Sequence, residues 1–399
     1  MPQPQWRKNQ IAVTITVSLQ NFGYYLIMPF LPIYVRQLGI EGIGEIAFWS
    51  GLITGISPLL ASFTGTFWGR LGDRHGMKVI AVRAAASNTF FYFMMALCRN
   101  VWQLLLVRAL LGLGGGFQNV SVALVTQYSP REKVPSIIGS LQSFQILSAA
   151  LGPFVGGILA SSIGIRNTFL VNGVLNVTAL LSVIFLYGEQ ERSSQAPGKA
   201  TAGPGLSGFW RQPEYFTSLL ILFFVNMADR TFGPIIPLFL EELGTPAARL
   251  AVVSGGVISA AALGEAFSAW VSGQLATRVS LRRLITGRLV FSILVLVPMI
   301  FVTSAEQFSV LRVVLALLAG GTLTLALSAA HRVIPEERRG SGFGLLSSVS
   351  MFGTAVGPLI AGAIAGISLR SIFVFNSIVY LMMIAFVARN VKEMASTAR

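Results

Sequence analysis

Two carboxyl groups and five guanidiniums lie inside long apolar stretches of the chain, and they are the residues best suited to chemistry. The acids are Asp229 and Glu265, and the basic residues are Arg83, Arg108, Arg230, Arg288 and Arg312. An ionised side chain costs at least about 2.5–3.5 kcal/mol at the centre of a membrane helix, so a charge retained there usually faces a cavity or a partner. Burial favours the protonated carboxyl, whereas a nearby guanidinium favours the ionised one. Asp229 and Glu265 are therefore the candidates for taking up a proton on one side of a membrane and releasing it on the other, and a static ion pair with a helix arginine is the alternative for each.

Twelve apolar stretches position these residues. Of the 399 residues, 54% are hydrophobic and 11% are charged, far below the roughly 25% charge of soluble domains. Each stretch is long enough to cross about 30 Å of hydrocarbon, where only a helix satisfies its own backbone. The sequence therefore predicts an all-α membrane protein with spans at 10–36, 45–67, 78–98, 101–126, 134–160, 166–188, 217–241, 249–274, 281–303, 307–331, 339–365 and 369–391.

The net charge of +14 follows membrane topology. Most Lys and Arg residues lie at the two ends of the chain or in connections after even-numbered spans, and the opposite connections hold only Arg36, Arg99, Arg166, Arg249 and Arg370. This asymmetry places both termini in the cytoplasm and argues against a nucleic-acid partner. The first span has no small-residue cleavage site, so we expect it to be retained. A bacterial plasma membrane is the expected location, and the single Cys98 excludes an internal disulfide.

The chain consists of two copies of one unit, offset by 204 or 205 residues. PFLPIYVRQLG at 29–39 returns as PIIPLFLEELG at 234–244, and Gly-Pro at 152–153 returns at 357–358. Between the copies lies a segment rich in Gly, Ser, Ala and Pro, which is typical of a flexible linker. We expect a six-helix bundle at 1–188, a cytoplasmic linker at 189–216 and a second six-helix bundle at 217–399.

The segment GRLGDRHGMK, residues 69–78, is expected to connect the second and third spans. Its glycines, charges and spacing resemble the signature loop between helices 2 and 3 of the major facilitator superfamily. The resemblance implies two pseudo-symmetric six-helix halves, a substrate site between them near the midplane, and a monomer. It also implies a cytoplasmic latch between the halves, made by Gly69, Arg70, Asp73, Arg74 and Gly76.

Arg108 lies in LLLVRALLGLGGGF, which resembles the helix 4 motif of the same superfamily. The resemblance implies a role in proton coupling, although an arginine that only satisfies neighbouring carbonyls remains an alternative. Arg312 holds the equivalent place in the second copy but lacks the following glycine, which makes it the weaker candidate. Arg230 follows Asp229 directly, and because neighbouring helical side chains diverge by about 100° the two need not pair.

The fifth span contains the pattern G-x8-S-x3-G-P-x2-G-G. Its members are Gly139, Ser148, Gly152, Pro153, Gly156 and Gly157. This resembles the antiporter motif of the superfamily, with Ser148 where the family has Gly. The resemblance implies export and a bend that seals the central path against ion leak. A plain packing kink is the alternative, because 344–362 carries a related pattern.

Aromatic and amide residues within the spans are the candidates for lining a substrate cavity. They are Tyr24, Tyr25, Phe117, Gln118, Gln142, Gln145, Asn226 and Phe232. Such a lining suits small lipophilic compounds, including cations held by aromatic faces, although helix packing alone explains the same stripe. The sequence contains no Walker loop, metal cluster or nucleophile–base arrangement. We therefore expect neither an enzyme nor a cofactor or metal.

These features together resemble the twelve-helix drug:proton antiporters. The resemblance implies export of a lipophilic drug or metabolite in exchange for protons, by alternating access of the two halves across the bilayer. An exporter or proton symporter of sugars, amino acids or lipid precursors remains an alternative. So does a membrane receptor or scaffold that transports nothing, because fold alone does not fix function.

Overall fold

The computed structural model describes residues 5–114, 117, 121, 124–125, 129–188, 213–334 and 339–390, and every regular element among them is a helix. The N-terminal bundle contains α1 Gln5–Ile27, η1 Met28–Phe30, α2 Leu31–Gln37, α3 Ile43–His75, α4 Met77–Leu97, α5 Val101–Gly114, η2 Arg131–Lys133, α7 Val134–Ser162 and α8 Ile165–Leu186. The C-terminal bundle contains α10 Pro213–Arg230, α11 Ile236–Glu242, α12 Ala247–Leu275, α13 Leu281–Met299, α14 Ala305–Ala319, α15 Thr322–Val333, α16 Arg339–Ala365 and α17 Ser371–Asn390.

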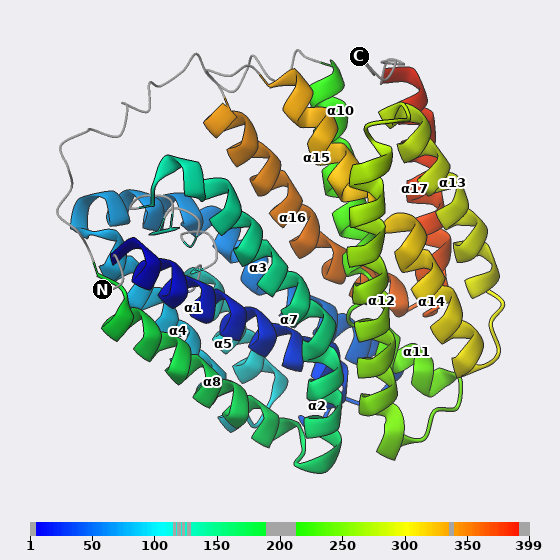
Figure 1. Ribbon diagram of the computed structural model, residues 1–399. Helices are drawn as coiled ribbons and strands as arrows, with labels where there is room; N and C mark the ends of the chain where they lie inside the picture. The colour runs from blue at the N-terminus through cyan, green and yellow to red at the C-terminus, as the bar shows by residue number, and fades with distance from the viewer. Residues whose placement is uncertain are drawn as a thin grey trace.

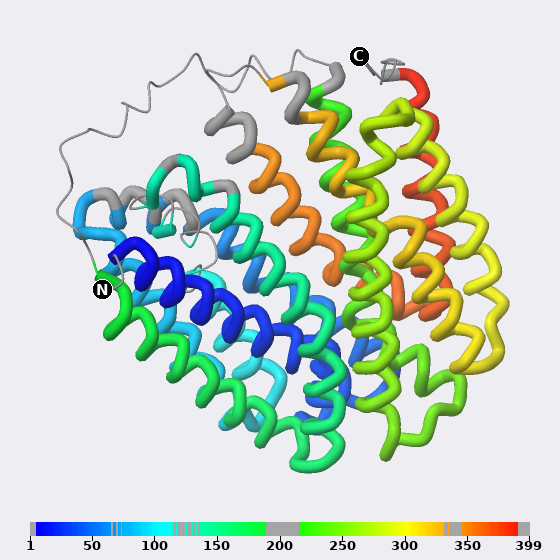
Figure 2. The backbone as a smooth tube through the Cα atoms, in the orientation of Figure 1, coloured from blue at the N-terminus to red at the C-terminus, as the bar shows by residue number. Residues whose placement is uncertain are grey.

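The two bundles lie side by side and use the same helix pairings (Figure 1). In the N-terminal bundle α1 packs on α7 and α8, and in the C-terminal bundle α10 packs on α16 and α17. Contacts between the bundles run from α3 to α16, from α7 to α12, and from α2 to α11. The tube in Figure 2 shows the bundles converging toward α2 and α11, at the helix ends remote from both termini.

The predicted all-α, membrane-spanning fold is confirmed. In the part of the chain that the structure describes, nine helical segments are long and apolar enough to cross a membrane. The remaining predicted spans coincide with α5, α10 and α13, which carry Arg108, the Asp229–Arg230 pair and Arg288.

Prolines interrupt the first span of each bundle, where the sequence predicts unbroken helices. Pro29 and Pro32 produce the 3-10 turn η1 between α1 and α2, and Pro234 and Pro237 follow the end of α10 at Arg230. Proline lacks the backbone N–H and clashes with the preceding turn, so the helix stops before it. As a consequence, Asp229 lies in the last turn of α10, whereas the sequence places it at mid-helix.

Residues 69–78 differ from the expected connecting loop. α3 continues to His75, and the chain turns at Gly76, which has φ +95° and ψ 141°. Only glycine adopts this conformation readily, so the glycine fixes where the helix ends. At 33 residues α3 is about 50 Å long and extends well beyond the hydrocarbon layer.

The tenth predicted span divides into α14 and α15 at Gly320 and Gly321. A Cβ at Gly320 would lie 2.6 Å from the Cα of Glu265 on α12. Because glycine has no side chain, the turn approaches the backbone of α12 more closely than it could with any other residue type at these two positions.

Candidate functional site

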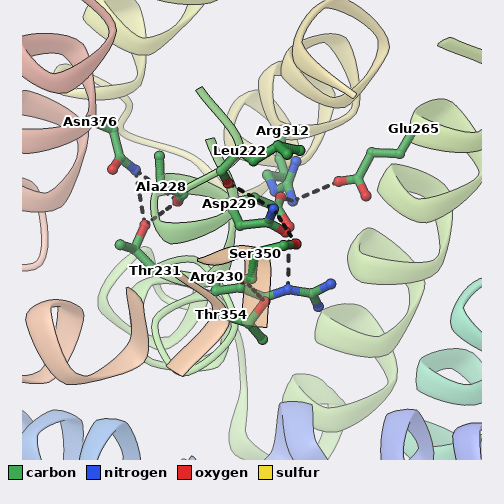
Figure 3. A network of polar contacts seen from close by, with 11 residues as sticks. Leu222, Ala228, Asp229, Arg230, Thr231, Glu265, Arg312, Ser350, Thr354 and Asn376 are labelled. Atoms are coloured by element: carbon green, nitrogen blue, oxygen red, sulfur yellow. Dashed lines mark hydrogen bonds and ion pairs between the residues drawn. The ribbon is translucent and has the colours of Figure 1, made fainter. Parts of the chain in front are cut away.

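Three charged side chains from three helices meet inside the C-terminal bundle (Figure 3). Arg312 Nη2 on α14 lies 3.3 Å from Asp229 Oδ1 on α10 and 3.3 Å from Glu265 Oε1 on α12. The Arg312 side chain is 8% exposed, whereas the two acids are about one-third exposed. Its guanidinium also lies 4.6 Å from the centre of the Phe232 ring. We call Asp229, Glu265 and Arg312 the charged triad.

Local backbone features place the two acids of the triad. Gly320 brings the α14–α15 turn against α12 at Glu265. Asp229 is held where α10 ends, because Asn376 of α17 donates a hydrogen bond to Thr231 Oγ1 at 2.9 Å in the turn that follows.

The triad has two carboxylates and one guanidinium. Arg312 carries one positive charge for the two carboxylates, and Asp229 also forms an ion pair with Arg230. The triad therefore places two carboxylates at one nearly buried guanidinium.

A cavity of about 500 Å³ lies between the two bundles. Residues of α1, α3, α4 and α5 line one wall, and residues of α10 and α16 line the other. Arg230 lines the cavity directly, and its Nε lies 3.8 Å from Asp229 Oδ2. Figure 3 shows the Arg230 guanidinium apart from that of Arg312. Arg230 therefore connects the cavity to the triad.

Three of the predicted cavity residues do line this space, namely Tyr24, Tyr25 and Phe117. Tyr24 is the repeat equivalent of Asp229, and Ala61, the equivalent of Glu265, also lines the cavity. In the C-terminal bundle the equivalent acids, Asp229 and Glu265, are not among the lining residues and meet at Arg312 instead.

The remaining predicted cavity residues are Asn226, Phe232, Gln142, Gln145 and Gln118. Asn226 and Phe232 are buried in and just after α10 and do not line the cavity. Gln142 is exposed and Gln145 half-buried on α7, both outside the lining. Gln118 lies outside the described residues.

Arg108 is fully buried in α5 and also borders the cavity. Its Nε donates to the carbonyl of Ile53 at 3.1 Å and its Nη2 to that of Thr54 at 3.5 Å, both on α3. Ser57 Oγ in turn donates to the Arg108 carbonyl. The guanidinium therefore binds α3 carbonyls and contributes its charge to the cavity wall.

The other two intramembrane arginines are repeat equivalents that join helices within each bundle. Arg83 Nη1 donates to the Gly114 carbonyl at 2.7 Å, and its guanidinium lies 3.3 Å from the centre of the Trp68 ring. Arg288 Nη1 donates to the Leu318 carbonyl at 2.9 Å. Neither residue lines the cavity.

The antiporter-like motif on α7 makes two kinds of contact. A Cβ at Gly152 would lie 2.7 Å from Tyr25 Cβ, and one at Gly156 would collide with the Leu26 carbonyl, so both glycines seat α7 on α1. A Cβ at Gly157 would lie 2.5 Å from the Ala251 carbonyl on α12, in the other bundle. The motif therefore supports both the N-terminal bundle and the interface between bundles.

The remaining members of the motif also differ in their surroundings. Ser148 Oγ donates to the Ser18 carbonyl of α1 at 3.1 Å, whereas Gly139 has open space where a Cβ would stand. Beside Pro153, the Phe154 N–H donates to Ser259 Oγ of α12 at 3.0 Å. A hydrogen bond from a backbone N–H to a serine side chain thus crosses between the bundles next to the proline.

The contact between α3 and α16 is the pseudo-symmetric counterpart of the contact between α7 and α12. A Cβ at Gly55 would lie 2.6 Å from the Ala355 carbonyl, and one at Gly362 would lie 3.0 Å from Phe48 Cα. These positions, like the α7–α12 contacts, lie in the parts of the helices remote from both termini. Close backbone packing therefore joins the two bundles at that end.

A bidentate ion pair joins the bundles at the same end. Arg36 Nη1 lies 2.7 Å from Glu241 Oε1, and its Nη2 lies 2.8 Å from Oε2. The two residues occupy equivalent positions, 205 residues apart, at the ends of α2 and α11. The charges at these equivalent positions are opposite, so the pseudo-symmetry brings them into contact.

Of the predicted latch residues, Arg74 is exposed in the last turn of α3 and Gly76 forms the turn that follows. The side chains of Gly69, Arg70 and Asp73 lie outside the described residues.

Sequence reasoning ranked Arg312 below Arg108 and gave Arg230 no role. The sequence feature that could have ranked Arg312 higher is the presence of two intramembrane acids in the same copy of the repeat. For Arg230 no sequence signal was available, because its place at the cavity wall depends on how α10 packs against the other bundle.

The model of the Major Facilitator Superfamily matches residues 13–307 and 219–398. The Multidrug resistance protein MdtG of Enterobacter lignolyticus is 30% identical over 396 residues, covering 98% of this chain and 94% of the relative. MdtG of Citrobacter koseri is 32% identical over 372 residues, covering 92% and 91%.

Solved structures share the fold. A bacterial homologue of the human lysosomal transporter Spinster, inward-facing and occupied, superposes with a TM-score of 0.79 at 16% identity, covering 99% of this chain and 98% of that one. Its unoccupied form gives a TM-score of 0.78 at 17% identity, with full coverage of both chains.

Proposed function

The chain belongs to the Major Facilitator Superfamily, and we propose that this transporter exports lipophilic compounds across the bacterial inner membrane in exchange for protons. The relatives named multidrug resistance proteins, similar over nearly their full length, support export of drug-like compounds. The antiporter-like motif on α7 supports exchange. The cavity between the bundles supports a substrate of drug size, because its volume lies within the range of known ligand pockets.

One observation carries the proton coupling: a single guanidinium is shared by two carboxylates, with 3.3 Å between Arg312 and each acid. Protonation of Glu265 or Asp229 leaves Arg312 bound to the other acid alone. We expect protonation to change the position of Arg312. We also expect it to change the ion pair between Asp229 and Arg230 at the cavity wall. A proton drives exchange only if it favours one state of the transporter over the other, and this rearrangement provides the difference.

The contacts between the bundles support alternating access. The bundles are joined at the end remote from the termini by α3–α16, α7–α12 and the Arg36–Glu241 ion pair. With both termini in the cytoplasm, this arrangement is closed to the outside. Rocking of the bundles would break those contacts and form others on the cytoplasmic side, where we place the latch of Gly69, Arg70, Asp73, Arg74 and Gly76.

Everted membrane vesicles with a fluorescent lipophilic dye and an imposed pH gradient test the proposal. We expect dye to accumulate in vesicles containing the protein, and a protonophore to abolish the accumulation. Asp229→Asn and Glu265→Gln should each remove gradient-driven accumulation while the purified proteins remain monodisperse. Gly287→Ala on α13, where the added methyl meets open space, serves as the control variant.

The other outcomes separate the alternatives. Dye accumulation that does not depend on the pH gradient indicates a facilitator. Accumulation that is absent for dyes but present for a sugar or an amino acid indicates a different substrate class. The absence of transport for every compound in the panel indicates a receptor or scaffold and contradicts the proposal.

A further inference from the structure

The cavity wall carries positive charge from both bundles. Arg108 contributes from α5 and Arg230 from α10, and no carboxylate occurs among the described residues that line the cavity. Counting the charged triad as well, three guanidiniums surround two carboxylates, and both carboxylates already contact arginine. The centre of the protein therefore has one positive charge in excess.

Two buried hydrogen-bond donors at this wall have no hydrogen-bond acceptor among the described residues, although one of them, Arg230 Nε, lies 3.8 Å from Asp229 Oδ2 in an ion pair. Arg230 Nε is buried without a hydrogen-bond partner among the described residues, and so is Gln20 Nε2, which also lines the cavity. Arg108 uses Nε and Nη2 for the α3 carbonyls. Donors that lack acceptors in a low-dielectric site favour a ligand that brings oxygen acceptors.

The rest of the lining suits an apolar or aromatic body. Tyr24 and Tyr25 meet edge to face with their ring centres 5.3 Å apart, and Phe117, Leu111 and Met351 complete an apolar surface. Guanidinium binds carboxylate, phosphonate and sulfonate groups through paired N–H donors, whereas it repels an ammonium group.

We propose that the compounds carried in this cavity bear an anionic group, held between Arg108 and Arg230, on an apolar or aromatic body. The proposal rests on the transport function given above and specifies its substrate class. It also replaces the expectation of a cationic substrate, because the aromatic faces that would hold a cation stand beside two guanidiniums. Arg230 is the residue that sets this preference from the C-terminal bundle.

Three forms of one skeleton test the preference: naphthylacetate, naphthylacetamide and naphthylethylammonium. Purified protein in nanodiscs is titrated with each compound, and the rise of its melting temperature gives the concentration for half-maximal stabilisation. We expect naphthylacetate to act at a concentration at least tenfold lower than naphthylethylammonium, with the amide between them. Equal or tighter binding of the ammonium form overturns the proposal, and so does the absence of binding by all three.

Variants of Arg230 locate the anion. Arg230→Gln should weaken naphthylacetate at least tenfold and leave naphthylacetamide unchanged, and Arg230→Lys should restore part of the loss. Arg288→Gln removes an intramembrane guanidinium that does not line the cavity, and it should keep the preference for the acid. Melting temperatures without ligand show that each variant is folded. An unchanged acid preference in Arg230→Gln overturns the assignment.

These titrations contain no proton gradient, so they separate the two proposals. If the protein prefers the acid but shows no gradient-driven transport, the proposed anion site stands and the proposed proton coupling is rejected. If the protein shows gradient-driven transport but no preference for the acid, only the proposed substrate class is rejected.

Discussion

Arg36 and Glu241 stand at equivalent positions of the two repeats and bind each other through two hydrogen bonds of 2.7 and 2.8 Å. The pair closes the end of the molecule remote from the termini, beside the close packing of α3 on α16 and of α7 on α12. Because both residues are partly exposed, the pair stabilises the closed end by at most about 1 kcal/mol, or about fivefold in population.

The first prediction concerns this ion pair. Glu241→Gln should shift the population toward opening at the outer end by about fivefold or less, and the exchanged pair Arg36→Glu with Glu241→Arg should restore it. Spin labels on either side of the contact measure the two populations, and the single native cysteine, Cys98, is buried. An exchanged pair that behaves like the single mutant would show that the ion pair does not hold this end closed.

The second prediction separates two glycines of the α7 motif. Gly157→Ala inserts a methyl between the bundles, next to the Ala251 carbonyl, and should slow transport by hindering closure of the outer end. Gly156→Ala inserts it within the N-terminal bundle and should instead lower stability by about 1–3 kcal/mol. Transport rates and melting temperatures of both variants, with Gly287→Ala as reference, check this contrast. Equal effects of the two substitutions would contradict it.

The third prediction tests the sharing of Arg312. The single substitutions Arg312→Gln and Glu265→Gln and the double variant form a double-mutant cycle. Its measured quantity is the free energy of unfolding. We expect Arg312→Gln to destabilise the protein in part because it leaves two carboxylates without their shared cation. The coupling energy should be about 0.5–3 kcal/mol. Additive effects would mean that the 3.3 Å contact contributes nothing.

The fourth prediction concerns the turn after α3. Gly76 has φ +95°, so Gly76→Ala should cost about 1–3 kcal/mol of stability even though its side chain is small. Gly287→Ala on α13 provides the control, because a Cβ there meets nothing within 4 Å and the helical backbone accepts alanine. Thermal unfolding of both variants measures the difference, and similar melting temperatures would refute this role for Gly76.

The fold could be predicted from the sequence because it rests on apolar length and on a repeat, both of which are visible in the chain. The interruptions were harder to foresee. Pro29 and Pro234 lie inside apolar runs long enough to span, and membrane helices often tolerate proline, so nothing in the pattern alone showed that α1 and α10 end there. The 69–78 segment looked like a loop because it is polar, yet a helix can continue past the membrane surface until Gly76 ends it.

The site could be predicted only in part, for a related reason. Scarcity of intramembrane charge identifies Asp229 and Glu265, but their meeting at Arg312 depends on how three helices pack. The pairing of Arg36 with Glu241 likewise follows from the pseudo-twofold relation of the bundles, since the residues are 205 positions apart. Arg230 is the last residue of α10 and lines the cavity, and neither fact could be read from the sequence.

Substrate-driven proton movement in everted vesicles tests the central claim most directly. With the lumen acidified and a pH-sensitive dye inside, addition of a transported compound should cause protons to leave the lumen of vesicles that contain the wild-type protein. Asp229→Asn and Glu265→Gln should each abolish this flux, because each removes one of the two carboxylates that share Arg312. A full substrate-dependent proton flux in both variants would contradict the account.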